Sequence, residues 1–160
     1  MKKLILCSIS LIGFAISANA QEEKNAIGLR LGDSDGFGTE VSYQRYLNEK
    51  NRLEFDLGWR SSNNFDAFRL TGLYQWVWNI DGGFNWYVGA GGGIAQVDFD
   101  NVPPGFDDSE TYVYAAGDIG IEYDFDFPLL LSLDFRPEFG FGDVNDDVDF
   151  DIALGVRYQF

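Results

Sequence analysis

Apolar and polar residues alternate with a period of two along most of this chain. From Leu53 to Trp59 every second residue is large and apolar, and the residues between them are charged or glycine. The same pattern runs from Phe150 to Phe160, and no stretch of comparable length shows helical periodicity. Successive side chains of a β-strand point to opposite faces, so each such segment has one apolar and one polar face. The alternation therefore predicts an all-β chain.

Reading the whole sequence in this way gives eight strands joined by connections rich in Gly, Pro, Asn, Asp and Ser, which are turn-forming residues. The expected strands cover residues 25–33, 37–47, 51–60, 66–79, 84–98, 111–124, 129–141 and 148–160. Short connections favour an antiparallel up-and-down order, and closure into a barrel removes the unpaired edges of such a sheet. We therefore expect an eight-stranded antiparallel up-and-down β-barrel.

The first twenty residues have the features of an export signal. Lys2 and Lys3 precede an apolar run from residue 4 to residue 16, and Ala18-Asn19-Ala20 forms a small-x-small cleavage site. We expect residues 1–20 to be a cleaved signal peptide and residues 21–160 to form one barrel domain. Cys7 is the only cysteine and lies in the signal, so the mature chain has no thiol chemistry.

Alternation alone does not say which face of the barrel is outside, because a soluble barrel encloses its apolar face and an outer-membrane barrel exposes it. Lysine is scarce, with Lys24 and Lys50 alone in the mature chain, although a soluble barrel would carry many on its polar face. The expected polar face is also rich in small residues, which suit a narrow lumen. Aromatic residues of the apolar face lie near strand ends, as in membrane-interface girdles. They are Tyr43, Trp59, Trp76, Trp78, Trp86, Phe139, Tyr158 and Phe160.

The C-terminal segment Val156-Arg-Tyr-Gln-Phe160 and the segment Trp86-Tyr-Val-Gly-Ala-Gly-Gly-Gly93 resemble strands of a known family. The chain is similar to the small eight-stranded outer-membrane proteins of Gram-negative bacteria, which include outer membrane protein X and the barrel domain of outer membrane protein A. The resemblance implies a transmembrane barrel in the outer membrane, inserted by the barrel-assembly machinery. It also implies periplasmic termini, with short periplasmic turns and longer outward loops at 33–37, 61–66, 98–110 and 141–149.

Charged residues of the polar face would then lie inside the barrel, where every base is an arginine able to make forked pairs with carboxylates. Filling and stiffening of the lumen is one interpretation, and a narrow or gated ion path is the other. Eight strands leave an interior just wide enough for side chains, which favours the first. The expected lumen residues are Arg30, Glu40, Arg52, Glu54, Asp56, Arg60, Arg69, Asp118, Glu122, Asp134, Arg136, Glu138, Asp151 and Arg157. Arg45 has the opposite parity and is expected to extend toward lipid headgroups.

The expected outward loops contain twelve acidic residues and no basic residue, which accounts for most of the net charge of −15. The simplest interpretation is that these acidic residues are solvated on the outside of the cell. Oxygen ligands also suit Ca²⁺ or Mg²⁺, either in a weak site or in bridges to lipopolysaccharide phosphates. The candidate ligands are Asp98, Asp100, Asp107, Asp108, Asp143, Asp146 and Asp147.

Composition limits the remaining function classes. The chain has no histidine, which removes the usual general base and the catalytic residue that lipid A-modifying barrels would require. The acidic charge argues against nucleic acid as a partner. We therefore expect a monomeric, non-enzymatic envelope barrel without a resident cofactor, whose acidic loops contact a surface ligand or lipid. The alternative is a porin-like protein, either a narrow ion channel or an accessory of a transport system.

Overall fold

A computed structural model describes residues 24–32, 38–61, 65–99, 109–141 and 148–160 of the chain, apart from the side chains of residues 65 and 99. The expected signal peptide, residues 1–20, lies outside the described residues. Among those described, no helix is long and apolar enough to cross a membrane.

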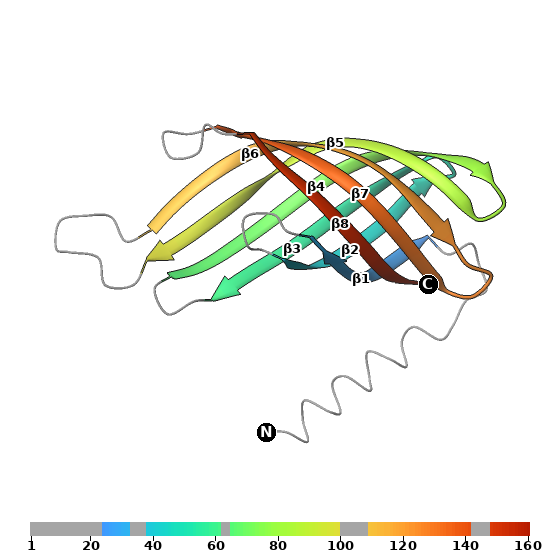
Figure 1. Ribbon diagram of the computed structural model, residues 1–160, viewed down its shortest axis with the longest axis horizontal. Coiled ribbons are helices and arrows are strands. Elements are labelled where there is room, and N and C mark those ends of the chain that lie inside the picture. Colours follow the sequence, from blue (N-terminus) through green and yellow to red (C-terminus); the bar gives the residue numbers. More distant parts are fainter. Residues whose placement is uncertain (1–23, 33–37, 62–64, 100–108, 142–147) are drawn as a thin grey trace, which may run out of the picture.

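Eight antiparallel strands form a closed barrel in which each strand pairs with its sequence neighbours and β1 pairs with β8 (Figure 1). The predicted fold class, an all-β up-and-down barrel, is therefore confirmed. The strands are β1 (Asn25–Leu31), β2 (Thr39–Asn48), β3 (Asn51–Ser61), β4 (Phe65–Asp81), β5 (Phe84–Phe99), β6 (Ser109–Asp124), β7 (Leu129–Phe141) and β8 (Val148–Gln159). Their ends differ from the expected ones by at most two residues.

The barrel has two different ends. One end, here called the turn end, carries the β2–β3, β4–β5 and β6–β7 connections together with Lys24 and Phe160 (Figure 1). Gly82 in the β4–β5 turn has a φ of 53°, which glycine adopts without steric cost. The opposite end, here called the loop end, carries the other four connections. Three of them are longer than any at the turn end, whereas the β3–β4 connection, residues 62–64, is as short as a turn.

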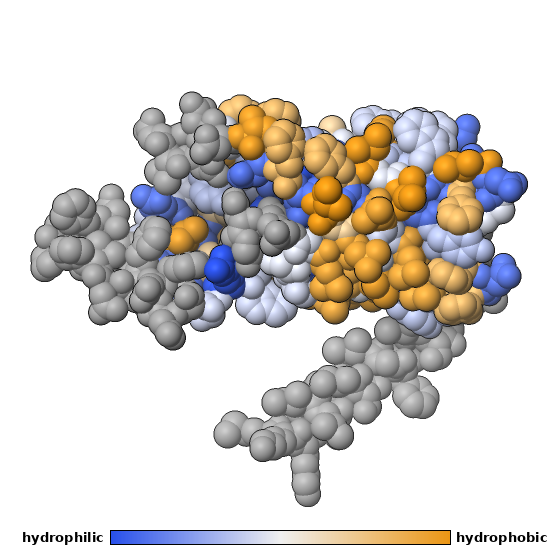
Figure 2. Space-filling model, in the orientation of Figure 1, coloured by the Kyte–Doolittle hydropathy of each residue, from blue (hydrophilic) through white to orange (hydrophobic). Residues whose placement is uncertain are grey.

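The outer surface of the barrel is apolar. Phe55 and Trp59 of β3 are 44% and 62% exposed. Every other strand also carries at least one large apolar side chain that is exposed. Figure 2 shows these side chains gathered in a broad band over the wall, with polar residues beyond it at the turn end. A soluble barrel would enclose the face that contains Phe55 and Trp59, so the structure excludes that arrangement.

Aromatic side chains mark both ends of this apolar wall. Trp78 and Trp86 stack near the turn end with ring centroids 4.6 Å apart, and Tyr158 and Phe160 are exposed at the same end. Toward the loop end, Trp59 is exposed near the end of β3 and Phe139 near the end of β7. Tyr43 is only partly exposed and donates a hydrogen bond to Asn25 Oδ1 at 2.9 Å.

The β6–β7 ladder contains an interruption that the alternation did not predict. Paired residues stop at Ala116 and Glu138 and resume at Ile119 and Phe135, although the register is unchanged. Pro137 lies in this gap, and proline has no N–H to donate to a neighbouring strand. The missing donor accounts for the break in pairing.

Candidate functional site

The interior of the barrel is the main concentration of charge in the described residues. Thirteen of the fourteen charged residues expected in the lumen are buried, at 6% exposure or less. Arg60 is the exception: it is exposed near the loop end of β3, beyond the enclosed part of the barrel. Arg45 is exposed as well. The alternation places the buried side chains inward, because each follows or precedes an outward apolar residue on its strand.

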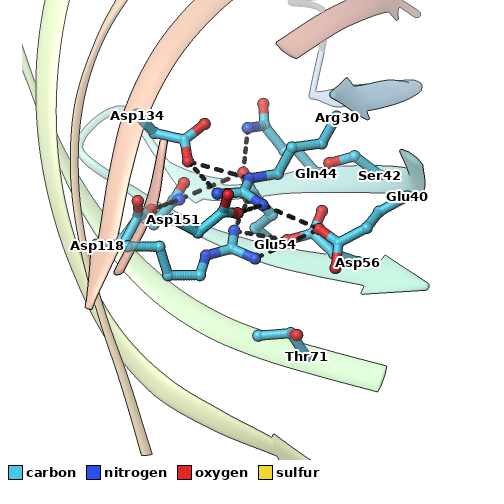
Figure 3. A network of polar contacts seen from close by, with 12 residues as sticks. Arg30, Glu40, Ser42, Gln44, Glu54, Asp56, Thr71, Asp118, Asp134 and Asp151 are labelled. Atoms are coloured by element: carbon cyan, nitrogen blue, oxygen red, sulfur yellow. Dashed lines mark hydrogen bonds and ion pairs between the residues drawn. The ribbon is translucent and has the colours of Figure 1, made fainter. Parts of the chain in front are cut away.

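Arg30 of β1 binds three carboxylates from three other strands. Its Nε donates to Asp134 Oδ1 at 3.0 Å, and its Nη1 donates to Glu40 Oε2 at 3.0 Å and to Asp151 Oδ2 at 2.6 Å. Figure 3 shows these groups converging on the barrel axis from β1, β2, β7 and β8. Such charge-assisted bonds lock the relative positions of strands that are far apart in sequence.

Arg136 of β7 is the second hub of the interior. Its Nη2 donates to Glu54 Oε1 at 2.9 Å and to Asp56 Oδ2 at 2.7 Å, and its Nη1 lies 3.7 Å from Glu40 Oε2. Glu40 also accepts a bond from Arg30, so it links the two hubs. Removal of the Arg136 guanidinium would leave the buried Asp56 carboxylate without this ion pair and would take one of two arginines from Glu54.

Glu54 is surrounded by polar side chains as well as by Arg136. Its Oε2 accepts hydrogen bonds from Gln44 Nε2 at 2.5 Å and Gln75 Nε2 at 3.2 Å, and Arg157 Nη2 lies 3.3 Å away. Arg157 in turn donates to the hydroxyls of two serines of the lumen, Ser42 and Ser132. These contacts extend the network around the barrel circumference.

Each end of the network contains a cation–π contact between an arginine and a tyrosine. At the turn end, the Arg52 guanidinium lies 4.7 Å from the Tyr87 ring centroid and 2.6 Å from Glu122 Oε2. Toward the loop end, Arg69 lies 4.7 Å from the Tyr114 ring centroid and contacts Glu138. The cation–π geometry of both pairs adds attraction in a site shielded from water.

The two tyrosines need space that only glycine provides. A Cβ at Gly120 would lie 2.5 Å from the Tyr87 ring, and a Cβ at Gly93 would overlap the Tyr114 ring. Tyr87 is fully buried, and Tyr114 is 5% exposed. Neither tyrosine was among the predicted lumen residues, although the alternation along β5 and β6 places both side chains on the inner face. The same alternation places the buried side chains of Gln44 and Gln75 on the inner face, and they too were not predicted.

The charged network extends along much of the length of the lumen. The network runs from Arg52 and Glu122 near one end to Arg69 and Glu138 near the other, and each arginine is held by carboxylates, amides or hydroxyls. Within the described ranges, no group of three or more His, Cys, Asp or Glu side chains could hold a metal ion. Of the candidate metal ligands, Asp98 is exposed and accepts a bond from Gln96 at 3.0 Å. The other six lie outside the described residues.

Known structures with the same fold support this architecture. The N-terminal β-barrel domain of Pseudomonas aeruginosa OprF has a TM-score of 0.66 and 17% identity, over 88% of this chain and 100% of that one. Neisserial surface protein A has a TM-score of 0.58 and 15% identity, over 85% of this chain and 94% of that one. Ail, the attachment invasion locus protein of Yersinia pestis, has a TM-score of 0.56 and 18% identity, over 85% of this chain and 96% of that one. No protein-family model and no curated protein matches the sequence.

The chain therefore has the fold of the small eight-stranded outer-membrane β-barrels. This is the fold class that the C-terminal pattern and the alternation predicted.

Proposed function

We propose that this chain is an outer-membrane β-barrel protein with a structural and surface-interaction role. The observation that carries the proposal is the inverted polarity of the barrel, with exposed apolar side chains on every strand and buried ion pairs inside. Water would solvate such an outer surface poorly, whereas a bilayer would solvate it well. The fold shared with outer-membrane proteins supports the same location.

Orientation follows from the connections. The connections at the turn end span two to four residues, as periplasmic turns do, and three of the four connections at the loop end are longer. We therefore place the termini in the periplasm and the acidic connections outside the cell. The protein would reach the membrane through an export signal and the barrel-assembly machinery, and its closed sheet, without a free edge, supports a monomer.

The filled lumen favours a structural role over transport. An eight-stranded barrel has room inside for side chains and little else, and here arginines with several partners cross that space. Surface contact would then be made at the loop end, where Asp66 and Asp98 are exposed. One similar structure is named for attachment and invasion, which is an example of such a role in that protein. Ca²⁺ or Mg²⁺ bridging the acidic rim to lipopolysaccharide phosphates is a compatible mode of contact. We propose no catalytic role.

Conductance measurements test this proposal directly. The refolded protein is expected to leave a planar lipid bilayer silent, because the Arg30 and Arg136 ion pairs obstruct the axis. A gel shift between boiled and unboiled samples verifies folding, and a large porin in the same lipid serves as the positive control. Discrete, reproducible single-channel steps from the folded protein would instead support the alternative, a narrow ion channel.

A further inference from the structure

A pocket of about 780 Å³ opens at the turn end of the barrel. Its walls come from residues at the ends of β2, β4, β6 and β8, from the start of β5, from the β2–β3 turn and from Lys24. The volume lies within the range of about 300–1,000 Å³ that is typical of small-ligand sites. Neither the lumen network nor the apolar wall accounts for the chemistry of these walls.

Two residues that line the pocket, Tyr46 and Asn85, contact the turn-end part of the lumen network. The Tyr46 hydroxyl accepts a hydrogen bond from Arg52 Nη1 at 3.2 Å and lies 3.4 Å from Glu122 Oε1. Asn85 Nδ2 donates to the same carboxylate at 3.3 Å. The pocket therefore adjoins the Arg52–Glu122 end of the lumen network.

Charges of both signs line the walls. Lys24 and Lys50 are the only lysines beyond Lys3 in the whole chain, and both line this pocket together with Glu49 and Asp124. The two lysines outside the expected signal peptide therefore lie at the same pocket. A pocket that offers ammonium and carboxylate groups together suits a ligand that carries both charges, and it suits neither a simple anion nor a metal ion.

Gln159 is a buried polar group facing this space. It is 6% exposed, lines the pocket and shares a hydrogen bond with Asp124, but its Oε1 has no hydrogen-bond partner among the described residues. Buried acceptors are normally satisfied. An N–H donor from a ligand would satisfy this one.

We propose that this pocket binds a short zwitterionic peptide. Its terminal carboxylate would face Lys50, its ammonium would face Glu49 or Asp124, and a peptide N–H would donate to Gln159 Oε1. The periplasmic source of such a peptide rests on the proposed function, but the binding itself does not.

Calorimetric titration of the folded barrel in detergent with tri-alanine tests the proposal. Tri-alanine is expected to bind saturably, whereas acetyl-tri-alanine amide, which lacks both terminal charges, is expected to bind at least tenfold more weakly. Lys50→Gln is expected to weaken tri-alanine binding at least tenfold, because it removes the partner of the carboxylate. Arg45→Gln removes the same charge at the same end from an exposed residue that does not line the pocket, and it is expected to change nothing.

Three results would overturn the proposal: no saturable binding at millimolar peptide, equal binding of the charged and blocked peptides, or equal effects of the two substitutions. Lys50 lies in an exposed turn, so its substitution leaves the fold intact, and a gel-shift assay verifies this for each variant. If the barrel folds and inserts into membranes but does not bind tri-alanine, the proposed peptide binding is wrong and the proposed function is unaffected. A chain that fails to insert refutes the proposed function.

Discussion

Replacing Arg136 with methionine is expected to lower the free energy of unfolding of the barrel by about 3–5 kcal/mol, the usual effect of removing one partner from a buried ion pair. The Arg136 side chain is fully buried and binds Glu54 and Asp56 at 2.9 and 2.7 Å. Without the guanidinium, two adjacent carboxylates would face each other in a space with little water. Urea unfolding in detergent micelles, followed by tryptophan fluorescence and gel shift, measures the loss.

A double-mutant cycle separates the ion pair from simple loss of packing. In the described residues, Arg136 is the only ion-pair partner of Asp56, so Asp56→Asn should destabilise the native barrel. In the Arg136→Met background the same change should be neutral or stabilising, because it removes an uncompensated charge. Arg45→Met, at an exposed position, is the control and should shift stability by less than about 0.5 kcal/mol. Additive effects of the two lumen substitutions would contradict the proposed coupling.

Introducing an arginine on the apolar wall is expected to destabilise the barrel in lipid by about 2–4 kcal/mol when the position lies near the bilayer midplane. Leu133 of β7 is such a position: it is 49% exposed and lies between Ile121 of β6 and Leu154 of β8. Leu133→Arg would bring a guanidinium into hydrocarbon. Equilibrium folding into phospholipid vesicles measures the cost.

Phe127→Arg provides the matched control for this experiment. Phe127 is 57% exposed, so it has similar apolar exposure, but it lies in the β6–β7 turn rather than in the wall. Its substitution should cost about 1 kcal/mol or less, as expected near the interface. Equal costs at the two positions would indicate that the wall around Leu133 does not contact the bilayer core.

The sequence alone predicts which face of the barrel is outside, because two independent patterns agree. Alternation around Phe55 and Trp59 defines two faces, and the scarcity of lysine assigns the apolar one to the outside. A period of two also determines which residues share a face, since a shift by one residue would invert every side chain. The strands and the buried set of charged residues therefore follow from local sequence.

The partners within the lumen could not be deduced in the same way. Whether Arg30 meets Asp134 or Glu138 depends on strand tilt and stagger around the closed barrel, and residues 104 positions apart in sequence come together only after closure. The inward positions of Tyr87 and Tyr114 follow from parity, but their stacking under arginines does not. The turn-end pocket likewise depends on how far each strand extends at that end.

Tryptophan quenching by brominated phospholipids is the most direct test of the central claim, that the apolar wall faces lipid. All four tryptophans, Trp59, Trp76, Trp78 and Trp86, lie on the outer face, and none lies in the lumen. In vesicles, brominated acyl chains should quench most of the fluorescence, with shallow bromines acting more strongly than deep ones because the rings lie toward the strand ends. Fluorescence quenched by aqueous acrylamide but untouched by brominated lipid would contradict the account.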